Sequence, residues 1–148
     1  MEFLNIKKLR EIAILPGRAT EGSAGYDLYA CLDSPVIIKK GETVMVHSGI
    51  AIEIPSCDYA AFVFARSGLA SKHGITLANS VGVIDSDYRG EIIVPLINLG
   101  TKNFTLNPKE RFAQMVFMPV CLPKLIKVNE FSQTKRGESG FGSTGMCK

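Results

Sequence analysis

The sequence predicts a single all-β domain, either a sandwich or a barrel. Short apolar runs of strand length recur between turn-forming residues, and only one short segment has the features of a helix. The 148 residues are enough for one domain with a sizeable core, and 46% hydrophobic with 21% charged residues is a globular composition. No internal repeat or linker divides the chain.

The first predicted strands flank a turn near residue 40. Residues 36–38 are Val-Ile-Ile, and residues 43–46 follow the turn-like sequence Lys-Lys-Gly-Glu, so we expect the two strands to form a hairpin. Residues 50–54 alternate as Ile-Ala-Ile-Glu-Ile, which is the period-two pattern of a half-buried strand, and Pro55 ends it.

Two further apolar runs, residues 59–65 and 91–99, have strand length. Pro95 in the second run lacks an N–H group, which predicts an edge strand or a bulge. Between the runs, residues 67–74 begin with serine, a preferred capping residue, and end with glycine. This pattern predicts a helix of one or two turns.

The last predicted strands are residues 104–106 and 111–119, separated by the turn Asn-Pro-Lys-Glu. After Phe131 the sequence becomes polar and glycine-rich to its end. We therefore predict a β domain over residues 1–131 and a mobile tail over residues 132–148.

Composition argues against several classes of protein. A net charge of +3, from 17 basic and 14 acidic residues, is too mild for nucleic-acid binding but suits a small anionic ligand. No stretch approaches the roughly 20 apolar residues of a membrane helix, and the first residues lack the pattern of a secretory signal. We expect a cytoplasmic protein without a membrane partner.

The cysteines carry little information. Cys31, Cys57, Cys121 and Cys147 are far apart, none forms a Cys-x-x-Cys pair, and the chain has only two histidines. A zinc site or a disulfide framework is therefore not expected.

The segment 81–90 places two carboxylates beside an apolar run. Asp85 directly follows apolar residues, so it lies where a strand reaches the surface and could act as a general base toward a bound water. Taken alone, a turn aspartate is the commoner role, and it fits Asp87 as well. Asn79 and Gly82 could form a tight hairpin whose backbone groups bind a planar ligand.

Two other segments suit anions. Arg66 and Ser67 stand where a strand runs into a helix start, although a plain helix cap would explain them equally well. Residues 136–145 combine spaced glycines with an arginine and hydroxyls, a pattern that fits phosphate binding or an ordinary linker. Arg111 and Gln114 are three apart on a predicted strand, so without a bulge they face opposite sides.

All these segments together resemble the trimeric dUTP diphosphatase family over nearly the whole chain. The five motifs of that family occur in order. They are matched by Ala24-Gly25-Tyr26-Asp27-Leu28, Arg66-Ser67-Gly68, residues 79–90, Glu110-Arg111-Phe112-Ala113-Gln114 and residues 136–145.

The resemblance implies roles in nucleoside recognition and water activation. Asp85 matches the acid that activates the attacking water, which is aimed at the α-phosphorus. Asn79, with the backbone through Gly82 and Val83, matches the hairpin that recognises uracil. Tyr88 matches the aromatic residue that packs beneath the deoxyribose and excludes a 2′-hydroxyl.

Other matches concern the metal, the base and the phosphates. Asp27 matches an acid linked to the water shell of the metal, and Phe141 matches a lid residue that stacks on uracil. Arg136 matches the γ-phosphate contact. The residues that match phosphate-binding or other active-site positions are Arg66, Ser67, Gly68, Arg111, Gln114, Arg136, Gly142, Ser143 and Thr144.

The resemblance also implies a distorted jelly-roll β barrel of the β-clip type that forms a homotrimer. Three active sites would lie between subunits, so Arg111 and Gln114 need not line one pocket, and the tail would cross to a neighbour. Mg²⁺ would be held chiefly by the triphosphate. Hydrolysis of dUTP to dUMP and diphosphate would limit uracil incorporation into DNA and supply dUMP for dTMP synthesis.

Three positions depart from the family pattern. Ala65 stands where proline is usual, Lys109 replaces a glycine and puts the positive φ of that turn in doubt, and Ser139 replaces a tail glycine. A dCTP deaminase is the nearest alternative, but its Arg-Ser-Ser motif is not found. A non-catalytic nucleotide-binding regulator would be expected to have lost Asp85 or the tail motif.

Overall fold

The computed structural model describes residues 3–138, and the fold of these residues is almost entirely β, as expected. One short helix, α1 (Ser67–His73), interrupts the strands. The strands are β1 (Asn5–Lys8), β2 (Tyr26–Tyr29), β3 (Val36–Ile38), β4 (Thr43–His47), β5 (Ile50–Glu53), β6 (Tyr59–Ala65), β7 (Ile75–Leu77), β8 (Gly82–Ile84), β9 (Ile93–Asn98), β10 (Phe104–Leu106) and β11 (Arg111–Pro119).

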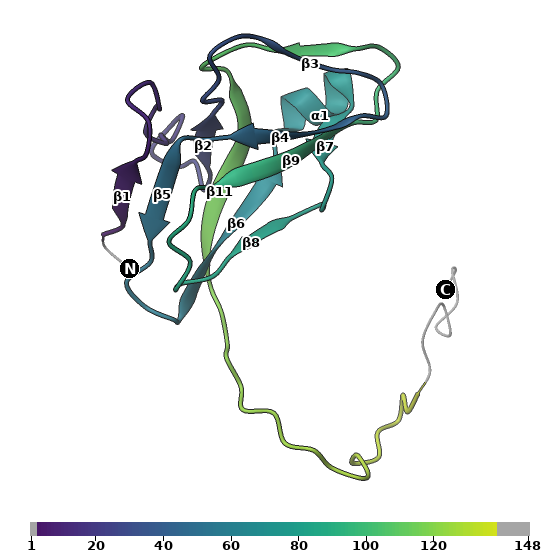
Figure 1. Cartoon of the computed structure of the whole chain (residues 1–148). Helices are drawn as coiled ribbons and strands as arrows, with labels where there is room; N and C mark the ends of the chain where they lie inside the picture. Colours follow the sequence, from purple (N-terminus) through teal and green to yellow (C-terminus); the bar gives the residue numbers. More distant parts are fainter. Residues whose placement is uncertain (1–2, 139–148) are drawn as a thin grey trace.

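Two antiparallel sheets form most of the body (Figure 1). One has the strand order β2-β11-β6-β8 and the other has the order β4-β9-β7. The pairs β1-β5 and β10-β3 complete it. The long β11 is central, because it pairs with β2 on one side and with β6 on the other.

The core is formed by side chains from one face of each sheet. In β9, Val94, Leu96 and Asn98 are buried while the residues between them are more exposed, so the strand turns alternate side chains inward. Leu28 and Met115 from the four-stranded sheet belong to the same buried cluster as Leu96.

The predicted hairpin of residues 36–46 is wrong, although its turn is present. Glu42 donates its backbone N–H to the carbonyl of Lys39 at 2.9 Å, but β3 pairs with β10 and β4 pairs with β9. Gly41 has a φ of 78° and donates its N–H to the carbonyl of Asn98 at 2.8 Å, which directs the chain onto β9. The two strands therefore enter different sheets.

The edge or bulge predicted at Pro95 is also wrong. β9 lies between β4 and β7 with an unbroken register. The Pro95 carbonyl accepts the N–H of Ala78 at 2.8 Å, so the Pro95 nitrogen also faces the β7 side. Because β7 ends at Leu77, opposite Leu96, the proline lies just past its last paired residue and removes no bond to β4.

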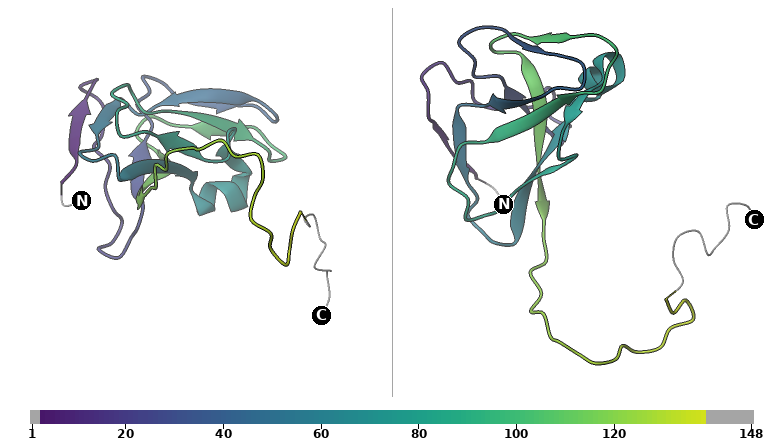
Figure 2. Two further views of the ribbon diagram at one scale, coloured as in Figure 1. Left: turned by 90° about the horizontal axis from the view of Figure 1, so that it is seen from below. Right: turned by 45° about the vertical axis from the view of Figure 1, so that its right-hand side comes forward.

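Beyond Pro119, the described residues 120–138 contain no helix or strand, and Figure 2 shows them leaving the body of the molecule. The division into residues 1–131 and a mobile tail stays a prediction. In the part of the chain that the structure describes, no helix has the length and apolar character needed to cross a membrane.

Candidate active site

The expected site residues fall into two pockets of the chain. The first, which we call the Asp85 pocket, has a volume of about 220 Å³, and the second, the arginine pocket, has about 380 Å³. The Asp85 pocket is lined by the expected residues Asn79, Gly82, Val83, Asp85 and Tyr88. The arginine pocket is lined by the expected residues Asp27, Arg66, Ser67, Gly68, Arg111 and Gln114.

The two pockets open on opposite faces of the same strand. Val63 of β6 lines the Asp85 pocket, and the next residue, Phe64, lines the arginine pocket. Side chains of adjacent strand residues point to opposite faces of a sheet. The two pockets also share no lining residue. A single copy of the chain therefore does not unite the two groups of residues in one pocket.

Strand β8 positions the acid of the Asp85 pocket. It pairs with β6, and Ile84 is buried while Val83 is 60% exposed, so the alternation turns Val83 outward. Asp85 follows the last strand residue and is exposed. This agrees with the expected place of an acid where a strand meets the surface, although one chain alone gives Asp85 little shielding from water.

The segment 79–82 is a turn between sheets and not the expected hairpin. β7 pairs with β9, whereas β8 pairs with β6. Ser80 has a φ of 65°, and Val81 donates its N–H to the carbonyl of Asn79 at 2.7 Å. The tight turn nevertheless brings Asn79 and Gly82 to the Asp85 pocket, as expected.

Tyr88 is brought close to Asp85 by a second turn. The Tyr88 N–H donates to the Asp85 carbonyl at 3.2 Å, and the Tyr88 hydroxyl donates to the Glu91 carbonyl at 2.9 Å. A Cβ at Gly90 would lie 2.3 Å from the Tyr88 hydroxyl oxygen, so the ring folds back over a position that only glycine leaves open.

In the arginine pocket, Asp27 joins two arginines from different elements. The Nε of Arg66 lies 2.9 Å from Oδ1 of Asp27, and Nη1 of Arg111 lies 3.0 Å from Oδ2. Arg66 also donates to the carbonyl of Arg111 at 3.1 Å. The Asp27 side chain is only 13% exposed, against 28% for Arg66 and 46% for Arg111. The carboxylate therefore fixes both guanidinium groups from below while they remain open to an anion.

A bulge in β11 brings Arg111 and Gln114 to the same pocket. The register of β11 against β2 shifts between Arg111 and Ala113, so the two residues no longer face opposite sides. This bulge is the exception that their three-residue spacing required, and the two residues line one pocket. Gln114 donates to the carbonyl of Ala65 at 3.0 Å, and a Cβ at Gly25 would lie 2.5 Å from its side-chain oxygen.

The start of α1 differs from the expected cap. Arg66, and not a serine, is the N-cap residue, and it makes no side-chain capping bond because a guanidinium group has no acceptor; it binds Asp27 instead. Ser67 and Gly68 form the first turn, where backbone N–H groups have no partner within the helix. The glycine end is as predicted, since Gly74 has a φ of 69°.

The expected tail residues do not reach either pocket within the described chain. Arg136 is exposed and lies in the segment that leaves the body (Figure 1). Phe141, Gly142, Ser143 and Thr144 lie outside the described residues.

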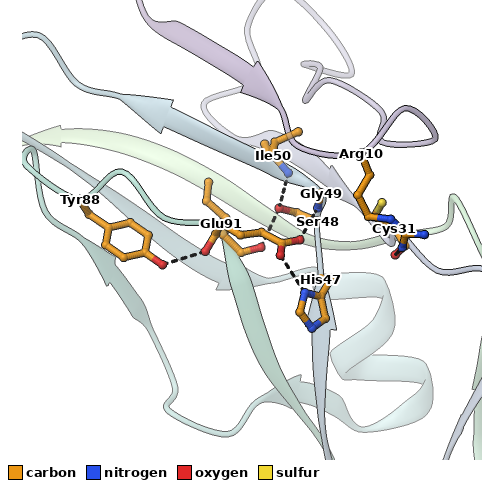
Figure 3. Close-up of polar contacts among 9 residues, drawn as sticks. Arg10, Cys31, His47, Ser48, Gly49, Ile50, Tyr88 and Glu91 are labelled. Atoms are coloured by element: carbon orange, nitrogen blue, oxygen red, sulfur yellow. Dashed lines mark hydrogen bonds and ion pairs between the residues drawn. The ribbon is translucent and has the colours of Figure 1, made fainter.

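Sequence reasoning missed a cluster beside the Asp85 pocket. The side chain of Glu91 contacts His47 at 2.9 Å and accepts the N–H of Gly49 at 2.8 Å (Figure 3). His47 and Glu91 are 44 residues apart and belong to no local motif, so no spacing signal could have found the pair.

A family model described as dUTPase matches residues 11–145 of the chain. The deoxyuridine 5′-triphosphate nucleotidohydrolase of Paraburkholderia phymatum is 53% identical over 131 residues, which are 88% of each chain. A structure of the Staphylococcus bacteriophage 80alpha dUTPase with dUPNHPP has a TM-score of 0.89 at 27% identity, covering 99% of this chain and 100% of that one.

A third similar structure is a dUTPase from phage phi11 of S. aureus, described for its coordination of a structural Mg(II) ion. It has a TM-score of 0.79 at 24% identity and covers 88% of this chain and 99% of that one. At this identity the likeness shows the fold alone. Together the two phage structures give this chain the jelly-roll fold of their family.

Proposed function

The chain belongs to the dUTPase family, and we propose that it hydrolyses dUTP to dUMP and diphosphate at a site composed of both pockets. The observation that carries the proposal is the distribution of the expected residues between the two pockets. Those matched to the base, the sugar and the attacking water gather in the Asp85 pocket, and those matched to phosphates gather in the arginine pocket. This division suits a ligand with a nucleoside at one end and a polyanion at the other.

Asp85 is the proposed general base. Its exposed carboxylate takes a proton from a water molecule, whose oxygen then forms a bond to the α-phosphorus. The bond from that phosphorus to the bridging oxygen breaks, and diphosphate leaves with the electron pair. Phosphoryl transfer of this kind depends mainly on positioning and on neutralising charge, so the protein needs no covalent intermediate.

Recognition of the nucleoside is assigned to the rest of the Asp85 pocket. The exposed Val83 offers an apolar surface, and the turn at Asn79 offers polar groups to the uracil edge. Tyr88 would pack beneath the deoxyribose, where a 2′-hydroxyl would clash. Sites whose polar groups match one substrate can discriminate by about 10⁴-fold, which supports selection against cytosine.

Phosphate binding is assigned to the arginine pocket. Arg66 and Arg111 are held by one carboxylate, so their planar donor groups are oriented before an anion arrives. Ser67 and Gly68 add a hydroxyl and free N–H groups at the start of α1. Gln114 supplies a further amide from β11.

A homotrimer is part of the proposal, because two pockets on opposite faces of one sheet need a second copy of the chain to complete them. In a cyclic trimer the Asp85 pocket of one subunit meets the arginine pocket of its neighbour, and three equivalent sites result. The tail, with Arg136 and Phe141, would then close over the bound nucleotide and order as it does so.

Mg²⁺ is the proposed cofactor, bound together with the triphosphate. Within residues 3–138, no group of three or more His, Cys, Asp or Glu side chains could hold a metal ion. We therefore assign most of the ligands of the ion to the triphosphate, with which it would arrive and whose charge it would neutralise. Asp27 would reach it only through water, since both carboxylate oxygens already have arginine partners. EDTA is expected to slow the reaction and added Mg²⁺ to restore it.

The test measures diphosphate release from dUTP, dCTP, dTTP and UTP by the purified protein. We expect dUTP to react at least about 100-fold faster than the others. Asp85→Asn tests the proposed base. It should still bind dUpNHpp, as measured by calorimetry, but its kcat should fall by a factor on the order of 10²–10⁴. Comparable rates with UTP would contradict the role of Tyr88, and near-wild-type turnover of Asp85→Asn would refute the proposed base. The proposal includes a cytoplasmic location, as expected from the sequence.

A further inference from the structure

We propose that Glu91 is a positioning residue that fixes the Tyr88 ring and thereby sets how strongly the site discriminates against ribonucleotides. The group formed by Glu91, His47 and the Gly49 N–H is called the Glu91 clamp below. The inference rests on the proposed function, because it assumes that Tyr88 contacts the sugar.

The first step is the direct contact between Tyr88 and Glu91. The Tyr88 hydroxyl donates to the Glu91 backbone carbonyl at 2.9 Å, and Glu91 itself lines the Asp85 pocket. Tyr88 is 45% exposed, so little packing holds its ring in place. The position of the ring therefore depends on the position of the Glu91 carbonyl.

The second step is the way in which Glu91 is held. One carboxylate oxygen accepts the Gly49 N–H at 2.8 Å, and the other lies 2.9 Å from Nδ1 of His47 (Figure 3). The Glu91 side chain is 21% exposed and that of His47 is 49% exposed. One partner, His47, is the last residue of β4 and the other, Gly49, lies in the turn between β4 and β5, so both are distant from Glu91 in sequence.

The turn that supplies these partners is itself rigid. Gly49 has a φ of 69°, and a Cβ there would lie 2.5 Å from the sulfur of Cys31. Ile92, the residue after Glu91, is bound to the same turn. Its carbonyl accepts the hydroxyl of Ser48 at 2.6 Å, and its N–H donates to the carbonyl of Ile50 at 3.0 Å. The Glu91 clamp therefore connects the Tyr88 ring to a fixed part of the β4–β5 turn.

The third step is the space beside the ring. Because a Cβ at Gly90 would lie 2.3 Å from the Tyr88 hydroxyl oxygen and 2.5 Å from the adjacent ring carbon, Gly90→Ala would displace the ring without removing any clamp contact. Two independent changes, one at Glu91 and one at Gly90, should therefore have the same effect on the sugar contact.

The experiment compares kcat/KM for dUTP and UTP in Glu91→Ala, Gly90→Ala, Tyr88→Phe and Glu91→Gln. In the first three variants the preference for dUTP should fall about tenfold, because Tyr88→Phe loses the hydrogen bond to the Glu91 carbonyl and the other two changes displace the groups that form it. Glu91→Gln should retain the preference, because an amide can still accept the Gly49 N–H and hydrogen-bond Nδ1 of His47. In Glu91→Ala combined with Tyr88→Phe, the loss should not exceed the larger single loss.

Glu53→Ala is the matched control. Glu53 holds Arg89, the neighbour of Tyr88, at 3.5 Å, but it makes no clamp contact. Its removal should leave the preference for dUTP unchanged. A Glu91→Ala protein that loses thermal stability but keeps the full preference would show that Glu91 is merely structural, and it would overturn the inference.

A second measurement does not depend on activity. In protein labelled at tyrosine rings, with the Tyr88 signal assigned from Tyr88→Phe, both Glu91→Ala and Gly90→Ala should shift the Tyr88 ring resonances. Unchanged resonances would overturn the clamp. If wild-type protein failed to hydrolyse dUTP while these resonances shifted, the proposed function would fail and the clamp would stand.

Discussion

Asp27 has two effects on the arginine pocket that oppose each other. Its negative charge lowers the positive potential offered to a phosphate, which weakens binding. Its two oxygens also hold Arg66 and Arg111 in fixed orientations at 2.9 and 3.0 Å, which lowers the entropy lost when they bind an anion. Both arginines are partly exposed, so water screens the charge effect more than it disturbs the geometry. We expect the orientation of the arginines to dominate.

Asp27→Asn is therefore expected to raise KM for dUTP about tenfold, the equivalent of roughly 1.4 kcal/mol. Steady-state kinetics at two Mg²⁺ concentrations check this, because a defect in holding metal water would be relieved by more Mg²⁺, whereas loosened arginines would not. Asp33→Asn, which removes an exposed partner of Arg10, is the control and should leave KM unchanged. An unchanged or lower KM in Asp27→Asn would mean that the carboxylate acts only as a counter-charge.

Contacts between residues that are close in sequence could be predicted, whereas contacts between distant residues could not. Asp85 and Tyr88 come together through one turn, so local sequence was enough to group them. The pair of His47 and Glu91 depends on tertiary structure and left no local signal. At Lys109, where the missing glycine put the turn in doubt, the lysine has a φ of 67° and donates its N–H to the carbonyl of Ala30 at 2.8 Å.

At the scale of elements, strands were predictable from their pattern but their partners were not. β5 and β6 coincide with apolar runs of strand length, which are visible in the sequence itself, although Ile50, Ala51 and Ile52 are all buried and so do not show the half-buried alternation expected of β5. The pairing of β3 with β10 and of β4 with β9 is accompanied by long-range contacts such as those of Asn98, whose buried side chain donates to Ile38 and Lys102 at 2.9 and 2.8 Å. The bulge that unites Arg111 and Gln114 likewise arises from register, not from composition.

Removing the tail is expected to impair catalysis while leaving the fold intact. Among the described residues, 121–138 are exposed and make no strand, so a chain that ends after Lys135 should keep its fold. It should lose a factor on the order of 100 or more in kcat/KM for dUTP, because the matched phosphate donors and Arg136 are gone. Diphosphate release measures the loss, and light scattering checks whether the proposed trimer persists.

The control for the truncated tail is a chain that ends after Gly145, which keeps the whole matched motif. It should have nearly full activity. Normal turnover by the chain that ends after Lys135 would contradict the proposed lid, whereas loss of the trimer would show that the tail is needed for assembly.

At the scale of the whole molecule, the arrangement of faces limits how a site can be built. Val63 and Phe64 are neighbours on β6, yet they line different pockets, and the sheet itself separates the two. A nucleotide that contacts both groups of residues must therefore lie between copies of the chain. The family resemblance already implied sites between subunits, but the residue pattern alone did not, because the positions of the two pockets depend on tertiary structure.

Mixing two inactive variants tests this arrangement directly. Asp85→Asn disables one pocket and Arg66→Ala disables the other, so each homotrimer should be inactive. If every site takes one pocket from each of two subunits, random co-assembly at equal amounts leaves both pockets intact in about a quarter of the sites. Co-expressed variants should therefore recover about a quarter of wild-type turnover, measured as diphosphate release at saturating dUTP. Recovery no greater than the sum of the separate variants would mean that each chain builds its own complete site, and the opposed pockets would then need a different explanation.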